Sequence, residues 1–360
     1  MVKIVVLFSM LVFGVYGSAQ DSTSVRLLFM GDVMGHDTQI NSARDEATGE
    51  YDYKSCFKYI EGDMKSADVA IANLEVTLAG PPHKGYPQFS SPDILADALQ
   101  EAGVDVLVTA NNHCVDRRQK GLERTCQVLD KKGIPRTGTF INDADRAQNN
   151  PIKMEVNGIR LALLNYTYGT NGIRVTEPNI VNHLDTAVMT QDIRKAKAFH
   201  PDQIIVFLHW GNEYQTAPNE DQKKLAQYLW NQGVNIVIGS HPHVIQPMHW
   251  LKDSTQNKLV VYSLGNYISN QRTAPRDGGA MASVELTKVG EECFISAANY
   301  QLTWVHTPYE NGKKKFYVLP VSRYEEAAAW PDSKARKRMN VYAKEASTVF
   351  RNNTNVTEKR

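Results

Sequence analysis

The chain has 360 residues, of which 42% are hydrophobic and 22% charged, a composition typical of a globular protein and not of a disordered chain. Forty basic and thirty-nine acidic residues give a formal net charge of +1, so no overall field attracts nucleic acid or an anionic membrane surface. Recognition of an anion must therefore depend on a local site, and nucleic acid is not an expected partner.

The first nineteen residues have the pattern of a secretory signal. Lys3 is followed by the apolar run IVVLFSMLVFGVYG, and the small residues Gly17 and Ala19 come just before a polar segment. This pattern predicts cleavage after Ala19 and an exported mature protein that is soluble in the periplasm or the extracellular space. The alternative is an uncleaved membrane anchor, although the run is short for a bilayer span.

Apolar runs of strand length alternate with helical patterns through the first 240 residues, which is typical of a layered α/β domain. Extended runs after residue 258 look like antiparallel strands and predict a second sheet packed on the first. No repeat or linker divides the chain. The expected strands of the first group are 25–30, 68–73, 104–109, 160–166, 203–208 and 235–239, and those of the second are 258–264, 280–289, 293–305 and 315–321.

Three helices between these strands have recognisable beginnings. Ser91 and Pro92 suit the cap and first turn of one helix. Asp116 suits the cap of the next, and Asn219 with Gln222 resembles a capping box for the third. Each is followed by apolar residues at helical spacing, so all three are expected to pack one face on a sheet.

Four cysteines in an exported chain are candidates for disulfides. Cys114 and Cys126 are not expected to pair, because a helix beginning at Asp116 would separate the two thiols by about 15 Å along its axis. Cys126 instead fits the apolar face of that helix. No position is predicted for Cys56 and Cys293.

Polar residues with metal-binding chemistry follow five of the six expected strands of the first group. In an open α/β sheet, sites collect beyond the carboxyl ends of the strands. Each motif alone is also explained by a turn, a cap or a hydrogen-bonded structural histidine, but together they predict a shared metal site. The motifs are Gly31-Asp32, Asn73-Leu74-Glu75, Asn111-Asn112-His113, His209-Trp210-Gly211-Asn212-Glu213 and Gly239-Ser240-His241-Pro242-His243.

The types of ligand limit the choice of metal. Imidazole, carboxylate and amide oxygen without thiolate suit Mn²⁺, Zn²⁺ or iron. In extended backbone, His241 and His243 would direct both imidazoles to the same side of the chain. Glu75 is placed to bridge two ions, which favours a two-metal hydrolytic site. We therefore expect one or two divalent metal ions.

In this order the motifs resemble those of the CapA-type poly-γ-glutamate capsule-synthesis family, which itself resembles calcineurin-type metallophosphatases. The resemblance also includes Ser263-Leu264-Gly265-Asn266-Tyr267 and runs from residue 25 to 285. It implies an α/β fold, the four-layer α/β/β/α sandwich of the calcineurin-like metallophosphatase type. The expected organisation is a signal peptide over 1–19, a CapA/metallophosphatase-like domain over 20–325 and a C-terminal helical extension over 326–360, with a surface helix near 333–350 and a frayed end.

Carried over motif by motif, the resemblance implies a role for His113 in assisting the leaving group or stabilising the transition state. One departure concerns the first motif, where the superfamily has a histidine and this chain has Met34; His36, two residues on, is a candidate replacement. Arg118 stands where the family usually has glycine. The implied metal ligands are Asp32, Glu75 and His243 in the first ion position, and Glu75, Asn112, His209 and His241 in the second.

Other charged residues are weaker candidates. Glu213 is a candidate catalytic base, or a support for His209 through its second ring nitrogen, with a plain surface charge as the alternative. The loop 81–87 is a candidate cover for the site, or a simple cluster of turns. Candidates for binding phosphate or carboxylate, with solvated charge as the alternative, are Lys84, Arg117, Arg272 and Arg276.

Two functions fit these observations. The first is a metal-dependent hydrolase, of the phosphoester type or acting on an envelope polymer, linked to poly-γ-glutamate or capsule biosynthesis. The second is a non-catalytic polyanion-binding component for polymer assembly or export. The expected partners are an anionic envelope substrate or polymer and capsule-synthesis membrane proteins.

Overall fold

The computed structural model describes residues 22–254, 257–326 and 332–359. The expected signal segment, residues 1–19, lies outside this range. Within the described residues, no helix combines the length and apolar content that crossing a bilayer requires.

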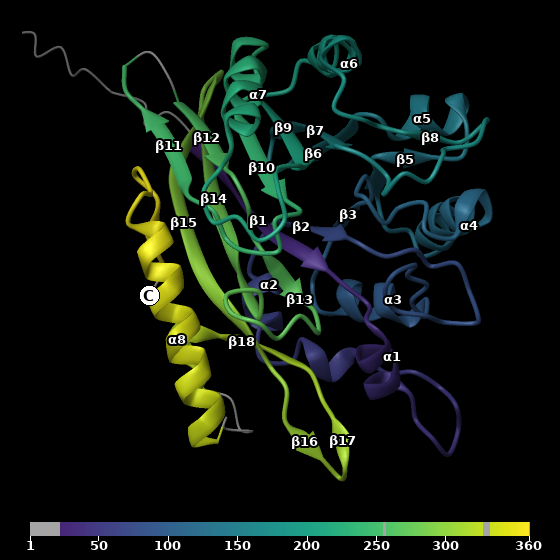
Figure 1. The fold of residues 1–360 in the computed structure, drawn as a ribbon. Coiled ribbons are helices and arrows are strands. Elements are labelled where there is room, and N and C mark those ends of the chain that lie inside the picture. The colour runs from purple at the N-terminus through teal and green to yellow at the C-terminus, as the bar shows by residue number, and fades with distance from the viewer. Residues whose placement is uncertain (1–21, 255–256, 327–331, 360) are drawn as a thin grey trace, which may run out of the picture.

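Two β-sheets pack against each other at the centre of the molecule (Figure 1). The first, called the β1 sheet, contains β1 (Ser22–Val33), β2 (Val69–Leu74), β3 (Val106–Val108), β4 (Arg136–Thr137), β13 (Asn266–Ile268), β14 (Gly278–Val289), β15 (Glu292–His306), β18 (Tyr317–Pro320) and β19 (Thr357–Glu358). Its order is β18-β15-β14-β1-β2-β3-β4, with β13 also paired to β1 and β19 to β15.

The second, called the β9 sheet, has the order β11-β12-β10-β9-β7-β6. Its strands are β6 (Ile152–Val156), β7 (Ile159–Thr167), β9 (Gln203–His209), β10 (Ile236–Ser240), β11 (Met248–Lys252) and β12 (Asn257–Val261). Two short pairs lie outside both sheets, β5 (Thr139–Phe140) with β8 (Ile180–Val181) and β16 (Tyr309–Glu310) with β17 (Lys313–Lys314).

Strand β1 shows how the sequence produces the layers. Val25, Leu27 and Phe29 belong to the core between the two sheets, whereas Leu28 and Met30 belong to a second core on the outer face. This division follows from the alternation of side chains along a strand. Both faces of β1 are therefore buried.

Helices cover the outer face of each sheet, which completes the four layers expected from the sequence. Leu95 and Leu99 of α3 pack on the β1 sheet, and Ile193 of α6 with Leu229 of α7 pack on the β9 sheet. The helices are α1 (Asp37–Ala43), α2 (Glu61–Lys65), α3 (Ile94–Glu101), α4 (Arg118–Lys131), α5 (Asp143–Asn149), α6 (Thr186–Lys197), α7 (Glu220–Asn231) and α8 (Ser333–Phe350), with 3₁₀ turns η1 (Lys54–Cys56) and η2 (Val321–Glu326).

The prediction that the later strands form the second sheet is wrong. The first group is divided between the sheets, since β1, β2 and β3 lie in one and β7, β9 and β10 in the other. Of the later strands, β12 joins β10 in parallel, while β14, β15 and β18 extend the β1 sheet in antiparallel fashion. Both sheets bury an inner face in one core, so the apolar pattern of a strand carries no information about its partner.

Of the predicted helix ends, the capping box of Asn219 and Gln222 is confirmed at α7. The cap predicted at Ser91 is wrong, because α3 begins at Ile94 and the Ser91 N–H instead donates to the Thr77 carbonyl. The cysteines are all free, and Cys126 is buried as expected.

Helix α8 matches the predicted range and begins with Asp332, whose carboxylate accepts from the Ala335 N–H at 2.7 Å. The expected frayed end is wrong for residues 351–359. The Thr354 N–H donates to the Met248 carbonyl at 3.0 Å, and β19 pairs with β15. The backbone groups of an edge strand need hydrogen-bond partners, and residues 351–359 supply them to β11 and β15.

Candidate metal centre

The carboxyl ends of strands from both sheets meet at one place, where the predicted metal-binding residues lie. Asp32 is at the end of β1 and Glu75 follows β2. From the β9 sheet, His209 ends β9, and His241 and His243 follow β10. The site therefore lies between two sheets, and not along the edge of a single sheet as the sequence suggested.

Two glycines let the strands approach closely at this end. A Cβ atom on Gly31 would lie 2.0 Å from the Gly265 carbonyl oxygen, and one on Gly239 would lie 2.0 Å from the Tyr262 carbonyl oxygen. A side chain at either position would push these strands apart and with them the residues that follow.

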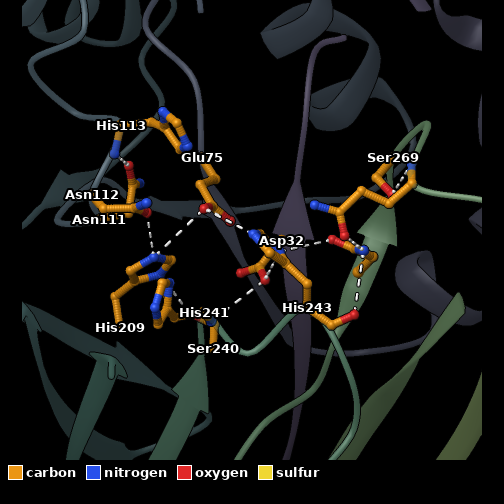
Figure 2. Close-up of polar contacts among 12 residues, drawn as sticks. Asp32, Glu75, Asn111, Asn112, His113, His209, Ser240, His241, His243 and Ser269 are labelled. Atoms are coloured by element: carbon orange, nitrogen blue, oxygen red, sulfur yellow. Dashed lines mark hydrogen bonds and ion pairs between the residues drawn. The ribbon is translucent and has the colours of Figure 1, made fainter. Parts of the chain in front are cut away.

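The six predicted ligands come together in two overlapping groups. Their possible ligand atoms lie within 4.8 Å of one another in the group Asp32, Glu75 and His243, and likewise in the group Glu75, His209 and His241. The Asn112 Oδ1 atom adds to the second group, because it lies 2.7 Å from His209 Nε2. Figure 2 shows Glu75 between His209 on one side and Asp32 and His243 on the other. Glu75 is the member that the two groups share.

The histidine pair does not have the extended backbone expected from the sequence. His241 has φ +100° and His243 φ +56°, in the left-handed region that ordinary residues rarely adopt. Their ring centroids are 6.1 Å apart, and those of His209 and His241 are 4.7 Å apart. The prediction of an extended strand is therefore wrong; a tight turn brings the rings together, and such strained backbone is typical of functional sites.

Glu75 is fully buried, and neither of its carboxylate oxygens has a hydrogen-bond partner in the described structure. Burial raises its pKa well above the ordinary value, and the negative charge of Asp32 raises it further. Such an orphaned carboxylate is expected where a cation binds, because an ion would supply the charge and the contacts that the protein withholds. The residues present therefore fit one or two divalent ions.

Three of the neighbouring groups, Asp32, His209 and His241, are held in the forms that bind metal. Burial alone would raise the pKa of Asp32, but the hydrogen bond and charge of His243, with the Asn73 amide, lower it below the ordinary value. Burial lowers the pKa of His209 well below the ordinary value, and burial with the charge of His243 lowers that of His241 to about 3. Ionised carboxylate and neutral imidazole are the ligand forms that metals require.

His113 forms a pair with Asp116, which the sequence had assigned to a helix cap. Helix α4 begins at Arg118, and the Asp116 carboxylate instead lies 2.7 Å from His113 Nδ1 while accepting from the Phe89 N–H at 2.7 Å. A hydrogen on Nδ1 would be donated to this carboxylate, an arrangement that leaves Nε2 for a reacting group. The spacing His113-x-x-Asp116 is the sequence signal that would have identified this pair.

Two of the alternatives left open by the sequence are not met. Glu213 is exposed and does not hold His209, whose Nδ1 lies 3.1 Å from Ser240 Oγ instead, while its role as a catalytic base stays a prediction. His36 does not replace the histidine absent at Met34, since its Nδ1 contacts Gln39 Oε1 at 3.0 Å and it belongs to neither ligand group. A histidine two residues later falls past the end of β1, where the chain turns into α1.

The basic residues considered as anion-binding candidates, and the loop 81–87, differ in the residues that they contact. Lys84 forms an exposed ion pair with Asp37 at 3.2 Å. The Arg117 Nε is buried without a partner just before α4, and the Arg272 guanidinium lies 5.5 Å from the ring of Trp304. After the loop 81–87, Phe89 packs its ring 4.6 Å from that of His113.

Comparison with known proteins agrees with this architecture. The family model described as bacterial capsule synthesis protein PGA_cap matches residues 26–271. The capsule biosynthesis protein CapA of Bacillus anthracis is 26% identical over 282 residues, 75% of this chain and 66% of that protein. The PGA biosynthesis protein CapA of Bacillus subtilis (strain 168) is 27% identical over 270 residues, 73% of this chain and 68% of that protein. The chain thus spans about two thirds of the length of these relatives.

Among solved structures, the NAD nucleotidase NadN of Haemophilus influenzae is similar with a TM-score of 0.51, covering 91% of this chain and 68% of that one. At 12% identity, this likeness shows the fold alone. The fold is of the metallophosphatase type, as the sequence predicted.

Proposed function

The chain belongs to the bacterial capsule synthesis protein family PGA_cap, and from this premise we propose that it is an exported metal-dependent hydrolase. Its substrate is an anionic phosphoester or envelope polymer of poly-γ-glutamate or capsule biosynthesis. The apolar pattern of residues 1–19 supports export to the periplasm or the extracellular space. Capsule-synthesis membrane proteins are the proposed partners.

The buried carboxylate of Glu75 is the observation that carries the proposal. It has no hydrogen-bond partner and lies 3.5 Å from His209 Nε2 and 3.8 Å from His243 Nε2. A carboxylate placed only for stability would have a donor. We assign Asp32, Glu75 and His243 to one ion position and Glu75, Asn112, His209 and His241 to the other.

When bound there, divalent ions would activate water and neutralise charge on the reacting group. The protein's own contribution to proton transfer is His113. Its Nδ1–H is held by Asp116, so protonated His113 presents Nε2–H to a leaving group and gives up that proton as the bond breaks. Asp116 is fixed in turn by the Phe89 N–H, which keeps the imidazole in one orientation.

The test is turnover of the generic phosphodiester bis(p-nitrophenyl) phosphate, and of a γ-linked glutamate polymer, by protein loaded with Mn²⁺ or Zn²⁺. We expect His113→Ala to lower turnover by about 10²-fold or more, the usual contribution of a general acid, with metal content unchanged. His183→Ala, which changes an exposed histidine, is the matched control. Metal-loaded protein that binds the polymer but turns over neither substrate would contradict the hydrolase and favour the polyanion-binding function.

A further inference from the structure

Each group of candidate ligands has a half-exposed tyrosine against it. The Tyr168 ring centroid lies 4.5 Å from that of His241, and the Tyr214 centroid lies 6.2 Å from that of His243. The two tyrosines are 45% and 44% exposed although both contact fully or nearly buried histidines. They therefore stand where the buried centre meets solvent.

A cation lies on the Tyr214 ring. The guanidinium carbon of Arg276 is 4.3 Å from the ring centroid, which places a positive charge one aromatic ring away from His243. The ion pairs found in the described part of the chain include none with Arg276, although Tyr214 interacts with Glu213 as well as with Arg276. A guanidinium over an aromatic ring has further N–H groups with which to bind a carboxylate or phosphate.

Backbone hydrogen bonds fix both members of this pair to the metal centre. The Arg276 carbonyl accepts from Asn266 Nδ2 at 2.8 Å, and Asn266 Oδ1 lies 3.1 Å from His243 Nδ1. On the other side, the Tyr214 N–H donates to the Pro242 carbonyl at 2.8 Å. Tyr214 also has φ +66°, a conformation that its surroundings must impose. The backbone of both residues is therefore tied to the site.

The other basic candidates lack this combination. Lys84 is neutralised by Asp37 in an exposed ion pair. Arg272 is turned against Trp304, and burial lowers its pKa to about 10. Arg117, just before α4, has a buried Nε without a partner. Among the hydrogen bonds of the described residues, Arg276 is the one of these four candidates that is connected, through Asn266, to a candidate metal ligand.

We propose that Arg276, supported by Tyr214, binds a carboxylate of the substrate beside the first ion position. This inference rests on the proposed function, because it places one substrate unit at the ions and a neighbouring carboxylate at Arg276. Arg276 is a specificity-determining residue and not a metal ligand, so its removal should leave the ions in place.

The test measures, by calorimetry, how tightly metal-loaded protein binds a γ-linked glutamate pentamer. The matched ligand is the same pentamer with each α-carboxylate replaced by a carboxamide. We expect Arg276→Ala to weaken binding of the glutamate pentamer about tenfold or more, as for the loss of one charge-assisted hydrogen-bonded pair. Arg276→Lys should fall in between, because it keeps the charge but not the planar fork. The carboxamide pentamer should bind weakly to all forms. Arg194→Ala, an exposed arginine on α6, is the control.

Metal content measured on the same samples separates damage to the centre from loss of recognition. If wild type and Arg276→Ala bind the glutamate pentamer with equal affinity and both retain metal, the inference is wrong. That result would not contradict the proposed hydrolase activity, which could act on other esters. Arg276-dependent binding without any turnover would instead contradict the proposed hydrolase and leave the carboxylate site in place. Tighter binding of orthophosphate than of the pentamer, lost in Arg276→Ala, would show a phosphate site and also overturn it.

Discussion

The middle and the carboxyl end of the central strands differ: the middle contributes to stability, and the end carries the residues of the candidate site. In the middle of β9, Ile205 and Phe207 are buried among apolar side chains from both sheets, whereas two residues after Phe207 the strand ends in buried His209. The same change occurs in β1 between Phe29 and Asp32. The apolar part stabilises the fold by burial, and the polar ends place acids and imidazoles in a low-dielectric environment at a cost to stability. The candidate metal centre thus differs from the rest of these strands in the polar groups that it gathers.

The largest expected change in the free energy of unfolding comes from a substitution in the apolar part of a central strand. Phe207→Ala should lower the free energy of unfolding by about 3–5 kcal/mol, because it removes a fully buried ring and leaves a cavity. Urea unfolding of the two proteins measures the difference. Tyr309→Ala, at a residue that is 75% exposed, is the control and should change stability by less than about 0.5 kcal/mol. A loss below about 1 kcal/mol for Phe207→Ala would mean that this core does not set stability.

The next largest change in stability is expected from metal binding at the polar ends of the strands. Addition of Mn²⁺ or Zn²⁺ at about one hundred times the dissociation constant should raise the free energy of unfolding by about 2.7 kcal/mol per site occupied. Phe207→Ala should keep this gain, whereas His209→Ala should lose most of it. A gain that His209→Ala retains in full would mean that the ions bind elsewhere.

The two ion positions should also differ from each other. The position with Glu75, Asn112, His209 and His241 has more protein ligands than the one with Asp32, Glu75 and His243, so it should hold its ion through dialysis. Elemental analysis should find about one retained ion, with a second only at high added metal. His241→Ala should empty the tight position and Asp32→Ala mainly the weak one. Two equally retained ions would contradict this order.

The smallest expected effect is a gain of stability in the metal-free protein. The raised pKa of Glu75 means that the folded state keeps a proton which the unfolded state releases above its ordinary pKa of 4.5. The favourable contribution is therefore complete below pH 4.5 and is lost as the pH rises toward the folded-state pKa. In chelator, Glu75→Gln should become more stable than wild type by about 1 kcal/mol or more as the pH rises from 5 to 8.

Unfolding measured across that pH range tests this, with Glu46→Gln at an exposed position as the control. The gain should reverse when metal is added, because the carboxamide introduced by Glu75→Gln binds ions more weakly than the native carboxylate. A Glu75→Gln protein that is less stable than wild type at pH 8 in chelator would show that the carboxylate has a stabilising partner.

Much of the fold and of the candidate site was predictable from the sequence. The strands were placed to within a few residues because apolar runs report burial, and the six expected ligands lie together because they follow strand ends. Their role as ligands stays a prediction. Sheet membership was not predictable, since β7 and β2 bury their residues in the same core and differ only in pairing.

Two local errors had a different origin. Asp116 has the composition of a helix cap, but its carboxylate is held by His113 and Phe89, contacts that no local pattern reveals. The alternation of His241 and His243 suggested a strand, whereas Asp32 accepts from the His241 N–H at 3.4 Å and lies 3.1 Å from His243 Nδ1. In both places tertiary contacts at the centre override the local preference, as is expected at a functional site.

The pairing of β1 with β14 determines when the centre can assemble. Val25 lies beside Leu286, which is far later in the chain, and Asp32 lies beside Asn266. During synthesis the first strand therefore emerges long before its antiparallel neighbour exists, and such distant contacts make folding slow. A chain shortened before residue 266 would contain every expected ligand but lack Asn266 and all of β14, so we expect it not to form the centre. Metal capture by the nascent protein is then expected only after these later strands are available.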